Sequence, residues 1–127
     1  MVTIDYWFDV PQVYVIIGFM KHLAEITLRT MTDRLVAEFD PDQIILFGSH
    51  AWGAPSEDSD VDLYVIVPES SERPLRRARR AIACLGGMRI SKDILVRTRK
   101  EAEKYRHVYA SLESQVFEKG RVLYERH

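Results

Sequence analysis

The stretch GSHAWGAPSEDSDVDLYVIV, Gly48 to Val67, contains the features that decide the fold of this chain. A glycine-serine pair follows a short apolar run, and two aspartates separated by one valine begin the next apolar run. Side chains alternate between the two faces of a strand, so Asp60 and Asp62 point to the same side. Two carboxylates that close raise each other's pKa unless a cation lies between them. The pattern therefore indicates a site for a divalent metal ion.

Apolar runs on either side of this stretch indicate alternating helices and strands. The expected helices span residues 20–39, 74–85 and 100–119, and the expected strands span 44–47, 61–67, 88–96 and 122–124. Such alternation in a short chain predicts an α+β fold with α/β-like alternation, in which helices pack on one small mixed sheet. We expect residues 1–127 to form one domain, with an N-terminal extension over 1–19 and a core over about 20–125.

Helical spacing also predicts which side chains are buried. In the helix that begins at Pro74, the expected apolar stripe is Leu75, Ala78, Ile82 and Leu85. In the last helix, the expected apolar residues are Ala102, Tyr105, Val108, Tyr109, Leu112, Val116 and Phe117. Five arginines between Arg73 and Arg80 indicate a solvated helix face. The alternative for these arginines is a docking surface for an acidic partner.

Composition excludes several classes of protein. The net charge is −1, from 18 basic and 19 acidic residues, which argues against direct binding to nucleic acid or to a membrane surface. The longest apolar run near the N-terminus has eight residues, whereas a membrane span needs about 20. Cys84 is the only cysteine, so no intrachain disulfide can form. These features predict a soluble protein in the reducing cytoplasm.

A third carboxylate completes the expected metal site. Asp93 lies in the third expected strand, and it joins Asp60 and Asp62 if that strand neighbours the second. Three carboxylates make a hard oxygen site suited to Mg²⁺, which binds carboxylates together with substrate phosphates. Such a site can hold two ions, of which one activates the attacking oxygen and the other stabilises the leaving pyrophosphate.

The glycine-serine pair supplies what a phosphate needs. Gly48 lets a phosphate approach the backbone closely, and the Ser49 hydroxyl with free N–H groups can hold it there. Together with the carboxylates, this pair predicts metal-assisted chemistry on a nucleoside triphosphate.

Gly48-Ser49, ten residues and then Asp60-Val61-Asp62 resemble the signature of the nucleotidyltransferase superfamily that includes DNA polymerase beta. The runs FGSHAWG (47–53) and SDVDL (59–63) are similar, more narrowly, to those of the minimal nucleotidyltransferases, the MNT antitoxins paired with HEPN toxins. The closing FEKGRVLY (117–124) is similar to the way these domains often end. The resemblance covers about residues 22–125. Trp52 stands where many relatives have arginine, which leaves the preferred base open.

The resemblance implies a role for each residue of the site. Gly48 and Ser49 would bind the triphosphate of ATP, and Asp60 and Asp62 would hold Mg²⁺. Asp93 would complete the metal site and help to deprotonate the acceptor hydroxyl. Antitoxins of this class transfer AMP from ATP to a tyrosine of a HEPN ribonuclease toxin, which would be both partner and substrate of this chain.

The sequence is also compatible with two other functions. The chain could neutralise a toxin by binding alone, or it could transfer a nucleotide to a small molecule or a nucleic acid. The lack of a second domain and the near-neutral charge weigh against the latter. Because Asp93 already provides a base, we expect His50 to be a structural or surface residue. The sequence leaves open the acceptor residue, the number of nucleotides transferred, the oligomeric state and the role of residues 1–19.

Overall fold

The computed structural model describes residues 12–52 and 60–127, and these fall into two compact units with their boundary between Met31 and Thr32. Helix α2 (Gln12–Phe39) begins in the first unit and ends in the second. It starts at Gln12, whereas the sequence predicted a start at residue 20. The prediction missed residues 12–19 because they carry no charge and lack the apolar-polar periodicity on which it depended. Within the described residues, no helix is long and apolar enough to cross a membrane.

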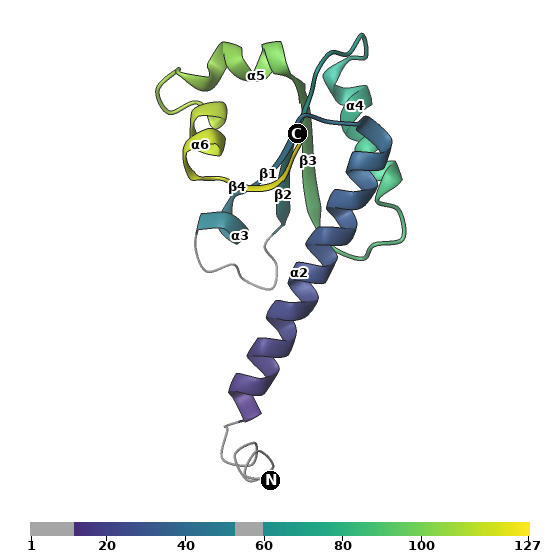
Figure 1. The fold of residues 1–127 in the computed structure, drawn as a ribbon, viewed down its shortest axis with the longest axis vertical. Coiled ribbons are helices and arrows are strands. Elements are labelled where there is room, and N and C mark those ends of the chain that lie inside the picture. Colours follow the sequence, from purple (N-terminus) through teal and green to yellow (C-terminus); the bar gives the residue numbers. More distant parts are fainter. Residues whose placement is uncertain (1–11, 53–59) are drawn as a thin grey trace. The chain divides into compact units, whose positions relative to one another are not determined.

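The second unit contains one four-stranded mixed sheet with the order β3-β2-β1-β4 (Figure 1). The strands are β1 (Gln43–Phe47), β2 (Val61–Val67), β3 (Lys92–Thr98) and β4 (Arg121–Glu125). Strand β1 is antiparallel to β2 and β4, and β2 is parallel to β3. The predicted α+β fold and the predicted first, second and last strands are confirmed. The third strand begins four residues later than predicted, at Lys92 rather than at residue 88.

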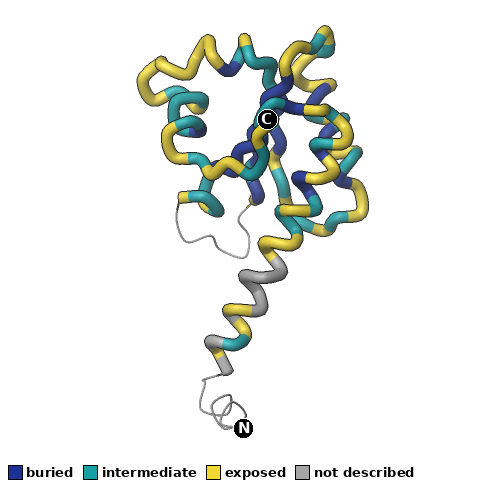
Figure 2. The backbone as a smooth tube through the Cα atoms, viewed as in Figure 1, coloured by how far each residue is buried: buried dark blue, intermediate teal, exposed yellow. Residues whose placement is uncertain are grey.

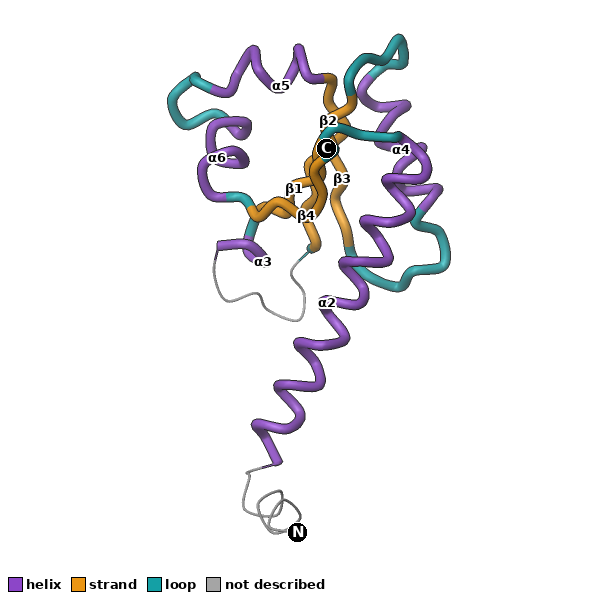
Figure 3. Tube along the Cα trace, in the orientation of Figure 1, coloured by secondary structure: helices purple, strands orange, loops and turns teal. Residues whose placement is uncertain are grey.

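Helices cover both faces of this sheet (Figure 3). They are α3 (Ser49–Trp52), α4 (Pro74–Cys84), α5 (Arg99–Arg106) and α6 (Leu112–Lys119), with the last turns of α2. Helix α4 is the crossover that parallel strands require, and it connects β2 to β3. Helices α5 and α6 lie on one side of the sheet and α4 on the other.

Strand β2 is the centre of the core and is buried on both faces (Figure 2). On one face, Tyr64 and Ile66 pack in a cluster with Ala102 of α5 and Val116 of α6. On the other face, the alternate residues of β2 are buried too. Because side chains fill the middle of the sheet on both sides, polar groups are accessible at the strand ends.

Helix α4 buries only part of the predicted stripe, because Leu85 is buried as predicted whereas Leu75 and Ile82 are exposed. Its buried residues are Arg77 and Ala81, followed by Leu85 after its last turn, whereas Leu75 is 63% exposed and Ile82 is 42% exposed. Periodicity assigns apolar side chains to the core, but an arginine occupies an interior position here because its charge is paired. Leu75 and Ile82 consequently lie on the outer side of the helix.

The predicted helix over residues 100–119 is two helices, α5 and α6, joined by a turn over 107–111. Ala110 adopts a left-handed backbone conformation with φ of 59°. The Ser111 side chain accepts a hydrogen bond of 3.0 Å from the Ser114 N–H and starts α6 as its N-cap. Tyr105 and Tyr109, predicted to be in the core, are 44% and 97% exposed. The sequence predicted one helix because the apolar spacing continues across the turn, although α5 ends before the turn and α6 begins after it.

Arg77 connects three elements through its guanidinium group. It donates to the Val96 carbonyl in β3 at 2.8 Å and to the Glu72 carbonyl at 3.1 Å. It also forms a two-bonded ion pair with Glu101 in α5, at 2.8 and 3.1 Å. The hydrogen bond from Arg77, with a further one from the Thr98 N–H, lowers the pKa of Glu101 to about 2 although burial opposes the shift.

We predict that Arg77→Met lowers the free energy of unfolding by about 2–4 kcal/mol, because two carbonyls and a carboxylate lose the hydrogen bonds that Arg77 donates to them. Arg79→Met, on the exposed side of the same helix, is the matched control and should change it by less than about 0.5 kcal/mol. Urea unfolding followed by circular dichroism at pH 7 measures both. Equal effects of the two substitutions would contradict the role assigned to Arg77.

The same ion pair predicts a pH dependence of stability. The pKa of Glu101 falls from its ordinary value of 4.5 to about 2 in the folded protein, so its contribution is complete above about pH 4.5 and lost as the pH falls towards 2. The stability difference between the wild type and Arg77→Met should therefore narrow over this window. Urea unfolding at a series of pH values checks it, and a constant difference down to pH 2 would contradict it.

Candidate functional site

The site begins where β1 ends and α3 starts. Gly48 turns the chain with φ of +76°, and its carbonyl accepts hydrogen bonds from the N–H groups of Ala51 and Trp52 at 3.0 and 3.1 Å. A Cβ atom at this position would lie 2.2 Å from Oδ2 of Asp62. Glycine is therefore required twice, for the backbone conformation and for the space that the carboxylate occupies. The turn holds the exposed Ser49 beside the N-terminal end of β2, which carries Asp62.

Strand register brings two of the predicted carboxylates together. Asp62 of β2 is paired with Phe47 on one side and with Asp93 of β3 on the other. Paired residues on neighbouring strands project from the same face, so Asp62 and Asp93 are side by side. The expected pairing of the second strand with the third is confirmed. The two side chains emerge on the face that α5 and α6 cover further along the sheet.

Asp60, just before β2, points to the same face as Asp62 and is held by a serine. The Ser91 hydroxyl donates a hydrogen bond to Oδ1 of Asp60. The backbone of the same two segments is joined by the bond from the Val61 N–H to the Ser91 carbonyl, at 2.9 Å. Ser91 thus connects the loop before β3 to the start of β2 and orients the first aspartate.

Electrostatics couples the three carboxylates. Burial raises the pKa of Asp62, and the negative charges of Asp93 and Asp60 raise it further. His50 in α3 acts in the opposite direction and lowers the pKa of Asp62. Lys92 does not neutralise the group, because its Nζ donates to the carbonyls of Met88 and Ile90, at 3.1 and 2.9 Å. The end of the sheet therefore retains an excess of negative charge that a cation would relieve.

The donor set fits Mg²⁺ that arrives with a phosphate. Among residues 12–52 and 60–127, no group of three His, Cys, Asp or Glu side chains is already placed to hold a metal ion. Mg²⁺ commonly uses one or two carboxylates and completes its shell with water and substrate phosphates. The neighbouring carboxylates of Asp62 and Asp93 match that requirement in chemistry.

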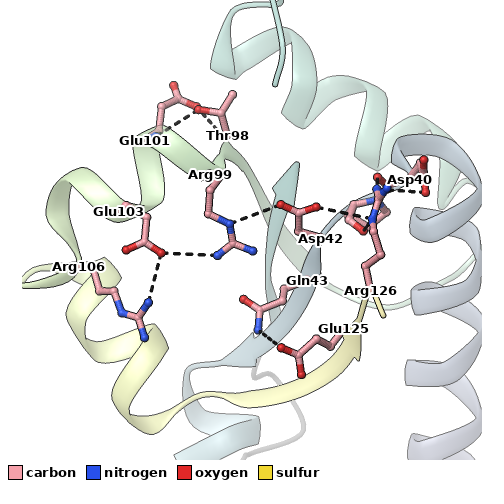
Figure 4. A network of polar contacts seen from close by, with 11 residues as sticks. Asp40, Asp42, Gln43, Thr98, Arg99, Glu101, Glu103, Arg106, Glu125 and Arg126 are labelled. Atoms are coloured by element: carbon pink, nitrogen blue, oxygen red, sulfur yellow. Dashed lines mark hydrogen bonds and ion pairs between the residues drawn. The ribbon is translucent and has the colours of Figure 1, made fainter. Parts of the chain in front are cut away.

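A hollow lies at the end of the sheet opposite to the candidate site. The two are about 15 Å apart along β1, because a strand rises about 3.3 Å per residue. The hollow has a volume of about 420 Å³. Its lining residues include Asp42, Gln43, Arg99 and Arg126 (Figure 4). Arg99 is 3.4 Å from Asp42, Arg126 is 3.6 Å from Asp42, and Gln43 donates to Glu125 at 3.2 Å. The charges of these lining residues compensate one another. We therefore interpret them as a network that stabilises the fold, not as a binding site with unbalanced charge.

The structure thus brings Gly48, Asp60, Asp62 and Asp93 to one end of the sheet, with Ser49 in the adjoining turn. Two contributors were not predicted from the sequence. Ser91 contacts Asp60 across 31 residues, a relation that depends on the parallel register and leaves no signal in local spacing. His50, expected to be a structural or surface residue, is half-buried and lowers the pKa of Asp62. Its position directly after the glycine-serine pair was the available signal.

Comparison with known proteins gives two matches. The family model of the nucleotidyltransferase domain matches residues 28–123. The fold is similar to the crystal structure of a protein from Sulfolobus solfataricus that has been assigned as a nucleotidyltransferase, with a TM-score of 0.57 and 16% identity over 79% of this chain and 78% of that chain. No curated protein matches the sequence significantly.

We predict that Gly48→Ala and Gly87→Ala have the same backbone effect but different effects on the site. Both glycines have positive φ, +76° and +86°, so each substitution should cost about 1–2 kcal/mol of stability. The added methyl group meets the Asp62 carboxylate only at position 48, because nothing lies within 4 Å at position 87. Gly48→Ala alone should weaken binding of a nucleoside triphosphate with Mg²⁺, by about tenfold or more. Calorimetric titration measures it, and equal binding by the two variants would contradict this geometry.

Proposed function

Because this chain belongs to the nucleotidyltransferase domain family, we propose that it is a Mg²⁺-dependent antitoxin that transfers AMP from ATP to a tyrosine hydroxyl of a HEPN-type ribonuclease toxin. One observation carries the catalytic part of this proposal: Asp62 and Asp93 are paired across β2 and β3, and the turn at Gly48 lies directly against the Asp62 carboxylate. The antitoxin part depends on the resemblance of residues 47–53 and 59–63 to the minimal nucleotidyltransferases.

Each residue has a role in the proposed transfer. Gly48 and Ser49 hold the triphosphate at the turn into α3, and Asp60, Asp62 and Asp93 would hold Mg²⁺. Bound Mg²⁺ would offset the charge that develops on the leaving pyrophosphate. The acceptor oxygen forms a bond to the α-phosphorus, the bond from that phosphorus to the bridging oxygen of the β-phosphate breaks, and pyrophosphate leaves. The Asp93 carboxylate takes the proton of the acceptor hydroxyl.

The exposure of the site supports a large acceptor. Asp60, Asp93 and Ser49 are exposed, and Asp62 is half-buried. A site that opens at the end of a sheet admits a side chain presented by another protein, whereas small substrates are generally enclosed in pockets. The alternative remains an antitoxin that acts by binding alone and keeps the nucleotide site without using it.

We predict that Asp60→Asn/Asp62→Asn abolishes transfer, with a loss of about 10³-fold or more, because the carboxylates that would hold Mg²⁺ are lost. The fold should be kept or slightly stabilised, because the substitution relieves the repulsion that raises the pKa of Asp62. Intact-mass spectrometry of proteins from the source cells, incubated with the chain, Mg²⁺ and each nucleoside triphosphate, measures transfer.

Asp33→Asn/Glu118→Gln is the matched control, because it removes the same number of charges from exposed positions away from the site. One small protein that gains nucleotidyl units with the wild type and the control, but not with the Asp60→Asn/Asp62→Asn form, supports the proposal. Transfer by the doubly substituted form would overturn the mechanism. A small protein that co-purifies with all forms and gains no mass would favour the binding-only alternative.

A second prediction concerns the metal without reference to transfer. Mg²⁺ should raise the midpoint of thermal unfolding of the wild type, because it binds the folded chain and relieves the repulsion among the carboxylates. EDTA should reverse the effect, and the Asp60→Asn/Asp62→Asn form should not respond. Differential scanning calorimetry at fixed ionic strength checks this, and an equal rise in both forms would count against a metal site at these residues.

A further inference from the structure

The outer side of α4 combines unpaired positive charge with exposed aliphatic side chains, and neither serves the fold. We call it the α4 outer face. Its residues are Arg73, Leu75, Arg76, Arg79 and Ile82, all of which are exposed. It lies on the side of the sheet away from α5 and α6 (Figure 1). The carboxylates of the candidate site emerge on the α5 and α6 side, so a molecule bound to the α4 outer face would leave them free.

The five arginines of this segment fall into two groups. Arg77 pairs with Glu101, and Arg80 pairs with Glu38 at 3.1 Å and also with Glu72. The side chains of the other three form no hydrogen bond or ion pair with any residue in the described part of the chain; they are Arg73, Arg76 and Arg79. Folding therefore uses two of these charges and leaves three unbalanced on one side of the helix.

The unbalanced charges lie where a helix least favours them. Arg73 is the N-cap of α4 without a side-chain cap, Arg76 is in the first turn, and that turn contains no acidic residue. The N-terminal end of a helix carries partial positive charge, so cations there are unfavourable and anions are favourable. The arrangement weakens the helix by itself, and an acidic partner would reverse the sign of the interaction.

Aliphatic side chains distinguish the kind of partner. Leu75, Arg79 and Ile82 follow the spacing of one helix face, so an arginine lies between two exposed aliphatic groups. Proteins that bind single-stranded nucleic acid supply aromatic side chains for base stacking, and this face has none. An amphipathic helix, in contrast, brings apolar groups flanked by charge to such a surface.

We propose that the α4 outer face docks an acidic amphipathic helix of the protein that receives the nucleotide. The identity of this partner as the acceptor rests on the proposed function, whereas the docking itself does not require transfer. Opposite charges on the two surfaces speed their encounter at low salt, and the aliphatic contacts of Leu75 and Ile82 retain the partner. A partner held on this side of the sheet leaves the carboxylates of the candidate site uncovered on the other side.

The test measures binding without nucleotide. The probe is a fluorescein-labelled 18-residue helical peptide with glutamate and leucine on one face, and its control is the same peptide with lysine in place of glutamate. A 15-nucleotide single-stranded RNA with the same label tests the nucleic-acid alternative. Fluorescence anisotropy with the full chain at three salt concentrations measures each dissociation constant.

Three variants separate the contributions. Arg73→Glu/Arg76→Glu/Arg79→Glu reverses the charge of the face, and Leu75→Ser/Ile82→Ser removes its aliphatic groups. The matched control, Arg29→Glu/Lys100→Glu/Lys119→Glu, changes the net charge equally at exposed positions outside the face. We expect the first two variants to bind the acidic peptide about tenfold more weakly or worse, and the control to bind within about twofold of the wild type.

A further readout excludes simple misfolding. Charge reversal at Arg73 and Arg76 should raise the midpoint of thermal unfolding, because acidic residues suit the N-terminal end of α4. A more stable variant that has lost binding supports a face kept for docking. The Asp60→Asn/Asp62→Asn form should bind the peptide as the wild type does, so failure of transfer and failure of docking remain distinguishable.

Three results would each overturn the proposal. The first is no binding of the acidic peptide by the wild type. The second is an equal loss of binding in the α4 variant and the matched control, which would make the effect one of net charge. The third is binding of the RNA, but not of the peptide, that depends on Arg73, Arg76 and Arg79.

Discussion

Parallel pairing of β2 with β3 places Asp62 beside Asp93, and most of the molecule is arranged to maintain that register. Parallel strands cannot be joined by a tight turn, so the chain crosses over through α4. Arg77 holds this crossover against the Val96 carbonyl of β3 and against Glu101 of α5. The register is stable because β2 is buried on both faces, and a shift of β2 relative to its neighbours would expose its apolar residues. Two like charges at its end are thereby kept together despite their repulsion.

The two ends of the sheet treat charge in opposite ways. At the end of β1 near Gln43, Arg99 and Arg126 are matched by carboxylates, so that end stabilises the fold. At the other end, the pKa of Asp62 is raised by burial and by its acidic neighbours, and Lys92 points to backbone carbonyls instead. Uncompensated charge of this kind lowers stability and is typical of a site that awaits a cation or a charged substrate. The protein therefore concentrates its electrostatic cost at the end of the sheet that carries the candidate site.

Helix α4 shows how one run of arginines can contribute in two ways. Arg77 is buried and Arg80 is half-buried, and their ion pairs hold α4 to its neighbours. Arg76 and Arg79 are exposed and pair with no residue in the described part of the chain. In the sequence they are indistinguishable, because all are arginines within one short segment. Their roles follow from the direction in which each side chain leaves the helix and from which carboxylates it meets there.

The sequence by itself determined the local features of the protein. An apolar strand beginning with two aspartates, a glycine before a helical turn and a proline at a helix start are short-range patterns, and the first two strands and the start of α4 were predicted from them. The same patterns identified Gly48, Asp60 and Asp62, whose spacing is local, and suggested Asp93 on condition that two strands are neighbours. They also missed the turn at Ala110, across which the apolar spacing continues although the backbone changes direction.

Only the tertiary structure decided the long-range relations. It paired Asp62 with Asp93, joined Ser91 to Asp60, and buried Arg77 while exposing Leu75 and Ile82. The physical reason is that periodicity reports how apolar a position is, whereas burial of a charge depends on a partner far along the chain. Glu101 is that partner for Arg77, and its distance from α4 in the sequence hides it until the sheet brings the two helices together.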